Sequence, residues 1–199
     1  KVIPAKNTTT NLYEDGIYYA LFVEDEVTIN YKGVAPDGTE FEGSNACGSV
    51  TPVSETIKVL TGDAMGSTAT AATSTYKFVG WYSNPSCDEQ YRVTETGWIL
   101  NEGTTIKPQL VNGVHVGTTY YAKFDWNVGQ LAITKNVDYP TGYSKESFPD
   151  DEFTFTVTLG DNTINGDYGA AKFVNGVATI TLKAGETATI SNLVHGTTY

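Results

Sequence analysis

The sequence predicts an all-β protein, and three observations carry that prediction. The chain contains 13 Tyr and 20 Gly, is 40% hydrophobic, and is visibly rich in Thr, Val and Ile. Such β-branched and aromatic side chains suit a pleated, half-buried surface. Short apolar or alternating runs recur along the chain, and turn-forming pairs separate them. Only residues 51–58 hint at a helix, and we expect at most one short helical turn there.

Nine segments have the alternation or β-rich composition of strands. They are residues 17–23, 27–31, 56–60, 76–82, 119–124, 131–137, 153–159, 177–182 and 187–193. Between them lie pairs and triplets that suit positive φ angles or tight reversals. These turn signals are Pro36-Asp37-Gly38, Asn112-Gly113, Asn165-Gly166, Asn175-Gly176 and Ala184-Gly185.

An internal repeat organises the first half of the chain. Tyr18-Tyr19-Ala20-Leu21-Phe22 is similar to Tyr120-Tyr121-Ala122-Lys123-Phe124, which lies 102 residues further along. Repetition at a fixed offset indicates a repeated module that ends in a Tyr-Tyr-Ala-x-Phe strand. We therefore expect residues 1–24 to be terminal strands of a preceding repeat, which pair with a neighbouring repeat or another chain.

The remaining length predicts two domains, since about 100 to 150 residues is usual for one. Residues 25–126 would form a complete repeat and residues 129–199 a second domain. The polar, glycine-containing stretch 125–130 is then expected to be a short linker that few contacts cross.

The first domain resembles the internalin B-repeat (Listeria-Bacteroides repeat), a β-grasp-like module of bacterial surface proteins. The resemblance lies in Val27–Tyr31, in Gly48–Ile57 and in the core motif built on Phe78, Gly80, Trp81 and Tyr82. It implies a mainly β module with some possible α+β character. Trp81 and Tyr82 point to opposite faces of a strand. We expect Trp81 to anchor the core and Tyr82 to approach the surface.

The second domain is similar to collagen-adhesin B-type domains, which are immunoglobulin-like β-sandwiches of bacterial adhesins. Phe153, Phe155 and Val157 alternate with Thr154 and Thr156, as in a sandwich strand. In the family one or two strands follow the Gly-Thr-Tyr turn, so the resemblance implies that the domain is incomplete at its C-terminus. The family also commonly forms an isopeptide bond from a lysine on its first strand.

Lys135 is the residue that matches this isopeptide lysine. Glu152 and Glu186 do not occupy the position of the family's catalytic acid. The partner asparagine and the acid would lie beyond residue 199. The alternative is an ordinary solvated strand lysine.

Cys47 and Cys87 are the only cysteines, and they are either a disulfide pair or two unpaired thiols. Two thiols without clustered histidines do not suggest a zinc site. His115 and His195 precede turns and are interpreted as surface turn residues. The loop containing Asp161, Asn162, Asn165 and Asp167 lacks the spacing of a calcium-binding EF-hand and is interpreted as a turn.

The net charge of −11 argues against nucleic-acid binding, which needs a basic stripe, and the sequence contains no such stripe. No apolar run approaches the roughly 18 residues of a membrane span. With no catalytic motif or cofactor signature, we predict a non-enzymatic stalk or adhesin segment of a bacterial cell-surface protein. It would be extracellular, anchored to the cell wall through regions outside this chain.

The predicted partners are neighbouring repeats and an unidentified surface protein or glycan of a host or neighbouring cell. The alternative is a carbohydrate- or protein-binding module. It would use exposed tyrosines, because flat aromatic faces stack on sugars and anchor partners. The candidates are Tyr13, Tyr82, Tyr91 and Tyr143.

Overall fold

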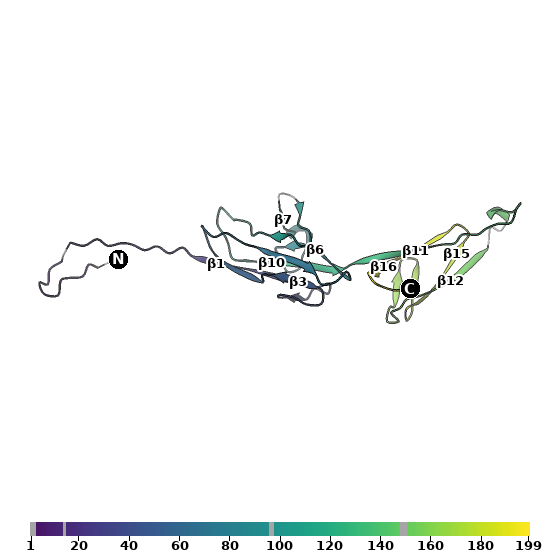
Figure 1. The fold of residues 1–199 in the computed structure, drawn as a ribbon, viewed down its shortest axis with the longest axis horizontal. Helices are drawn as coiled ribbons and strands as arrows, with labels where there is room; N and C mark the ends of the chain where they lie inside the picture. The colour runs from purple at the N-terminus through teal and green to yellow at the C-terminus, as the bar shows by residue number, and fades with distance from the viewer. Residues whose placement is uncertain (1–2, 14, 96–97, 148–150) are drawn as a thin grey trace.

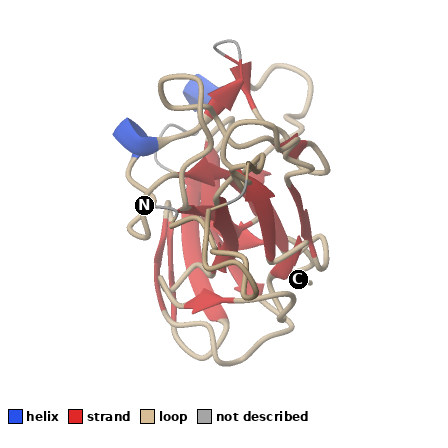
Figure 2. Ribbon diagram, turned by 90° about the vertical axis from the view of Figure 1, so that its left-hand side faces the viewer, coloured by secondary structure: helices blue, strands red, loops and turns tan. Residues whose placement is uncertain are grey.

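A computed structural model describes residues 3–13, 15–95, 98–147 and 151–199. Two β-rich units follow one another along the long axis, and an extended N-terminal arm precedes the first (Figure 1). Within the described residues, helical structure is limited to the 3-10 turns η1 (Glu89–Tyr91) and η2 (Lys145–Ser147) (Figure 2). The all-β prediction is therefore confirmed. The α+β character that the sequence allowed for the first unit is not seen in these residues.

The main sheet of the first unit is built around two parallel strands. Strand β1 (Glu26–Val34) pairs in parallel with β10 (Thr118–Trp126), with Tyr31 opposite Tyr120. The outer neighbour of β10 is the antiparallel β6 (Tyr76–Tyr82), and the outer neighbours of β1 are the antiparallel β2 (Glu40–Phe41) and β4 (Ser54–Lys58). Residues 54–58 are thus a strand, where the sequence allowed a helical turn.

A smaller sheet packs against one face of the main sheet. It contains β3 (Gly48–Thr51), β5 (Ser67–Ala71) and β9 (Thr105–Ile106), and a separate pair consists of β7 (Thr94–Glu95) and β8 (Trp98–Ile99). Side chains from both sheets form one buried cluster. Its largest fully buried members are Trp81, Tyr31, Phe124, Ile29 and Ile106.

In its described residues, the second unit contains three antiparallel pairs around a mainly aliphatic core, which also holds the buried ring of Phe173. Strand β11 (Val128–Thr134) pairs with β16 (Thr187–Val194), β12 (Glu152–Thr158) with β15 (Val177–Lys183), and β13 (Gly166–Tyr168) with β14 (Ala171–Phe173). In β15, buried and exposed residues alternate from Val177 to Leu182. This period of two is the pattern that predicted the strand.

The tight turn before β15 follows its sequence signal closely. Asn175 and Gly176 have φ angles of 50° and 75°, and Val174 bridges to Val177 across them. Two successive positive φ angles define the hairpin turn that matches the twist of antiparallel strands. The Asn-Gly pair therefore closes the tight turn that leads from β14 into β15.

The arm differs from its prediction. Residues 17–23 were expected to form a strand, yet the structure assigns no strand to them. Their large apolar side chains are exposed, with Phe22 90% accessible. Among the described residues of the arm, a single bridge joins Lys6 and Tyr13.

The boundary between the units is tighter than the linker that the sequence predicted. Strand β10 ends at Trp126 and β11 begins at Val128, so Asn127 alone separates them. Residues 128–130, expected to be part of a linker, belong to β11 because Val128 and Gly129 pair with Val194 and Leu193. The chain therefore passes from one unit to the other almost without interruption.

Candidate functional site

The core motif of β6 organises both faces of the main sheet. Phe78 and Trp81 contribute to the large core, where the Trp81 ring meets Phe78 edge-on at 6.2 Å and Tyr31 at 6.0 Å. Tyr82 points to the opposite face but is fully buried, contrary to the expectation that it approaches the surface. The reason is the loop 83–93, which folds back over it.

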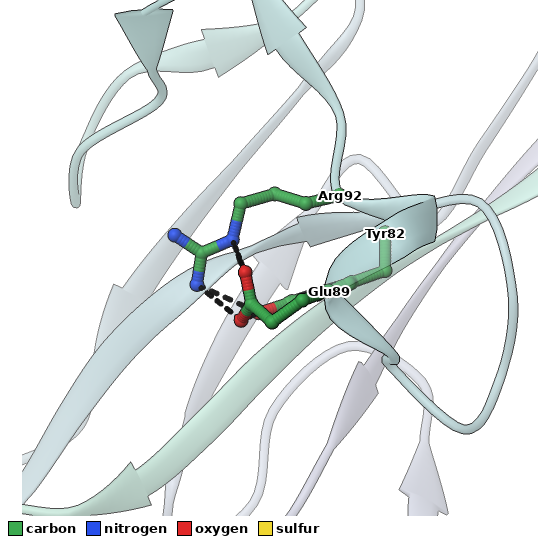
Figure 3. Close-up of polar contacts among 3 residues, drawn as sticks. All are labelled: Tyr82, Glu89 and Arg92. Carbon is green, nitrogen blue, oxygen red and sulfur yellow. Dashed lines mark hydrogen bonds and ion pairs between the residues drawn. The ribbon is translucent and has the colours of Figure 1, made fainter.

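Tyr82 is held there by a charged pair (Figure 3). Its hydroxyl donates to Oε1 of Glu89 at 2.9 Å and accepts from Nη2 of Arg92 at 2.7 Å. Arg92 also pairs with Glu89 at 3.1 Å, and its side chain is only 15% exposed. Burial raises the pKa of Tyr82. The hydroxyl therefore satisfies its hydrogen bonds in its neutral form.

Gly80 lies next to the Arg92 guanidinium. A β-carbon at this position would lie 3.4 Å from Cζ of Arg92, which is an ordinary van der Waals contact. The guanidinium carbon lies 5.3 Å from the centroid of the Tyr82 ring. The motif Phe-x-Gly-Trp-Tyr therefore contributes to the core on one face of the sheet and contacts Arg92 on the other.

The returning loop forms one wall of a groove of about 430 Å³. Backbone bonds fix the loop, because Ser83 N–H donates to the Tyr91 carbonyl and Val93 N–H to the Trp81 carbonyl. Tyr91 remains 45% exposed at the groove. Other groove residues include Arg92, Thr94, Gln109, Val111, Val116 and Thr118.

Gln109 holds the second wall in place. Its backbone N–H donates to the hydroxyl of Tyr120 at 3.3 Å, and its amide Nε2 donates to the Thr94 carbonyl at 3.3 Å. The groove thus combines an exposed aromatic ring, valine side chains and amide groups. The described lining residues include no carboxylate, histidine or thiol. The lining offers a ligand an aromatic face, hydrogen-bonding groups and the guanidinium of Arg92.

The four tyrosines proposed for binding occupy different environments. Tyr91 lines the groove, whereas Tyr82 is buried beneath it. Tyr13 is exposed in the arm, and Tyr143 is exposed in the second unit. The structure therefore does not gather them into one surface. Sequence reasoning missed Arg92 and Gln109, because single polar residues in irregular segments carry no periodic signal.

The two cysteines are free thiols in separate clusters. Cys47 is buried in the main core, and Cys87 packs with Val34 and Tyr82 on the other face of the sheet. The disulfide alternative is thus not formed, because the main sheet lies between the two clusters. Burial raises the pKa of Cys87 to about 11. Its thiol therefore stays protonated and unreactive near neutral pH.

Lys135 follows the end of β11. Its backbone N–H donates to the Glu186 carbonyl at 3.0 Å, and its ammonium lies 4.2 Å from the centroid of the Phe153 ring. Glu152 and Glu186 are exposed, and Glu186 accepts a bond from the backbone of Lys183. A cation above an aromatic face is a stable arrangement by itself. The isopeptide bond stays a prediction.

His115 was interpreted wrongly as a surface residue. Its ring is 7% exposed, and Nε2 lies 3.0 Å from the Gly62 carbonyl oxygen. Residues 61–66 fold over it, a contact that local sequence does not reveal. His195 is exposed, as expected.

The Asp161 loop is a turn. Asp161 Oδ1 accepts from the backbone N–H and hydroxyl of Thr163, and Asn165 Oδ1 accepts from Asn175 N–H. These oxygens therefore serve the turn itself. Within the described ranges, no cluster of three or more His, Cys, Asp or Glu could hold a metal ion.

Asn127 connects the two units through hydrogen bonds in both directions. Its backbone N–H donates to Thr75 and its side chain to Ser74, both in the first unit. Its carbonyl accepts from the backbone N–H of His195 in the second unit at 2.7 Å. Trp126 stacks on Tyr76 at 4.7 Å and also lines a cavity of about 460 Å³ with Tyr168 of the second unit.

The second unit is similar to a known family. Residues 129–199 match the family model of a domain of unknown function, DUF7601. None of the curated proteins and none of the solved structures gives a significant match to the chain. Among the described residues, no helix is long and apolar enough to cross a membrane.

Proposed function

We propose that the chain is a non-catalytic stalk or adhesin segment of a bacterial cell-surface protein. It would be extracellular and held at the cell wall through other regions of the protein. The observation that supports this proposal most directly is the junction. A single residue separates β10 from β11, and Asn127 is hydrogen-bonded to both units.

A junction of this kind limits rotation between the units. The hydrogen bonds from Asn127 to Ser74 and Thr75 fix the end of β10, and the bond from His195 fixes the start of β11. Stacking of Trp126 on Tyr76 adds a contact at the end of the first unit, next to Asn127. A series of units joined this way would hold a distal region away from the cell surface, which is what a stalk requires.

Residual dipolar couplings test this rigidity. In the intact chain, both units should share one alignment tensor. The change Asn127→Gly should separate the tensors, because it removes the side-chain bond to Ser74 and frees the backbone. Asn136→Gly, at an exposed position in the second unit, is the matched control and should leave them shared. Two independent tensors in the intact chain would contradict the stalk.

The groove favours a second candidate function, the binding of a carbohydrate or an extended peptide. Tyr91 presents an exposed ring beside Gln109, whose backbone and side chain are both anchored. A fixed aromatic face next to amide groups is a common way of holding a sugar ring. The ligand would belong to the surface of a host or neighbouring cell.

A glycan array with the intact chain separates the two functions. If the groove binds sugar, Tyr91→Ala should weaken binding by roughly 10-fold or more, the loss expected from removing an anchoring aromatic side chain. Tyr143→Ala, an exposed tyrosine in the other unit, is the control and should bind like the parent chain. An array without any signal removes the glycan function and leaves the stalk.

A further inference from the structure

The arm exposes apolar side chains that the structure does not explain. Ile17, Tyr19, Leu21, Phe22 and Val23 are each at least 80% accessible. The described part of the chain gives residues 16–23 no strand partner. Figure 1 shows this segment extending from the start of β1, away from both units. An apolar row of this kind indicates a surface that a partner covers.

Part of the arm is similar in sequence to β10, which lies between β1 and β6 in the main sheet. Tyr18, Ala20 and Phe22 correspond to Tyr120, Ala122 and Phe124. In β10 these three residues are 7%, 0% and 0% exposed, and they alternate with the half-buried Tyr121 and Lys123. The arm carries the same residues at these three positions.

A bridged turn precedes each of the two strands. The bridge joins Lys6 to Tyr13 in the arm and Val111 to Val114 in the unit. Each turn contains an asparagine with a positive φ angle, 53° at Asn11 and 54° at Asn112. The two turns differ in length, with six residues between the bridged pair in the arm and two in the unit, so the correspondence lies in the strand itself.

The environment of β10 defines what the arm would need. Ala122 lies opposite Gly33 of the parallel β1 and opposite Trp81 of the antiparallel β6. The ring of Phe124 meets Phe78 at 6.0 Å and occupies the space left by Gly48. A strand of this sequence is thus buried between one parallel and one antiparallel neighbour, with its phenylalanine packed among other rings.

We propose that residues 16–23 are the last strand of another module of the same type. They insert between the counterparts of β1 and β6 in a preceding module, with Tyr18 and Phe22 in its core. The inference rests on the proposed stalk for the presence of tandem modules. Its test is separate, because it examines strand pairing and not the rigidity of the junction at Asn127.

The test joins a recipient module to residues 16–199, which contain the proposed strand and both units. A second copy of residues 25–117, which lacks the β10 strand, is fused directly to Gly16 at the start of 16–199. Hydrogen exchange is then measured at the amides of Tyr18–Val23. These amides should exchange rapidly in the parent chain and be slowed by roughly 100-fold or more in the fusion.

Two substitutions provide the matched comparison. Phe22 and Leu21 are 90% and 88% exposed in the chain, so Phe22→Asp and Leu21→Asp should both leave the parent chain unchanged. In the fusion, Phe22→Asp should abolish the protection because it places a carboxylate in the core. Leu21→Asp should retain the protection, because its counterpart Lys123 is only half-buried.

Three results would overturn the proposal. The first is arm amides that exchange as fast in the fusion as in the parent chain. The second is equal behaviour of the two aspartate variants. The third is a parent chain that sediments as a dimer with protected arm amides, which would assign the strand to a second copy.

Discussion

The two units bury their cores with different chemistry. The first uses large rings, with Tyr31 stacked on Tyr120 and edge-on to Trp81. Burying these rings also buries their polar atoms, the tyrosine hydroxyls and the indole nitrogen. The second uses mainly aliphatic side chains such as Ile180, Leu182 and Ile190 on regularly alternating strands, together with the fully buried ring of Phe173. The aromatic core needs hydrogen-bond partners for its polar atoms, whereas the aliphatic core needs only a consistent face.

This difference indicates where a substitution should most reduce the stability of each unit. In the first, Tyr31 donates to Glu55 at 2.5 Å, while the indole nitrogen of Trp81 is buried and has no hydrogen-bond partner among the described residues. An unpaired buried donor is costly, so Trp81 must be retained for its ring contacts. In the second unit, stability is spread over many similar apolar contacts.

The largest expected effect is that of Trp81→Ala. Loss of a fully buried tryptophan should destabilise the first unit by about 3–5 kcal/mol. Trp81→Phe should cost less, because it keeps an aromatic ring beside Phe78 and removes the unpaired N–H. Hydrogen exchange measured unit by unit would show protection falling in residues 26–126 alone. An equal loss in both units would mean that they share one cooperative core.

Tyr31→Phe should have an intermediate effect. It removes a hydrogen bond to a carboxylate, which contributes about 1.5–3 kcal/mol. Burial and the bond to Glu55 raise the pKa of Tyr31, so the folded unit keeps this proton after the unfolded chain begins to lose it near pH 10. The stabilisation is complete below that pH and is lost as the pH rises above it.

Urea unfolding of the first unit at pH 8 and pH 10.5 checks this dependence. The parent chain should lose stability between the two pH values, and Tyr31→Phe should lose less. Tyr121→Phe, on the half-buried face of β10, is the matched control and should behave like the parent. The same pH dependence in the parent and in Tyr31→Phe would contradict the role given to Tyr31.

The smallest effect is expected in the aliphatic core. Ile190→Val removes one methylene from a fully buried site and should cost the second unit about 0.5–1.5 kcal/mol. Ile3→Val, at a residue that is 75% exposed, should change nothing measurable. Thermal unfolding of the two variants gives the comparison. A loss of stability above 3 kcal/mol from Ile190→Val would mean that this core depends on single residues as strongly as the aromatic core does.

Strands with an apolar face could be predicted from the sequence, and others could not. Residues 76–82 were predicted with the bounds that the structure gives to β6, and 177–182 nearly cover β15. The segment 67–71 was missed, because the run Ser-Thr-Ala-Thr-Ala has no bulky apolar face. It pairs with both β3 and β9 and thus depends on tertiary contacts.

The site could be predicted only in part. The motif around Trp81 was recognised as a core anchor, but the burial of Tyr82 depends on Arg92 returning from a loop ten residues later. The burial of His115 depends likewise on the carbonyl of Gly62. Such long-range contacts leave no local periodicity. The junction was read as a linker because Gly129 suggests flexibility, although it forms part of β11.

The parallel pairing of β1 with β10 has a mechanical consequence. A pull that enters at Glu26 and leaves at Trp126 draws these neighbouring strands past each other, so their pairs from Ile29–Thr118 to Val34–Lys123 are strained together. In the second unit, β11 is antiparallel to β16, and Val128 faces Val194. A pull across that pair separates one rung at a time.

Forced unfolding depends on the barrier along the direction of pulling. Single molecules stretched end to end should therefore lose the second unit at low force and the first at a much higher one. Under tension, the molecule would lengthen as the second unit unfolds, while the first unit stays folded.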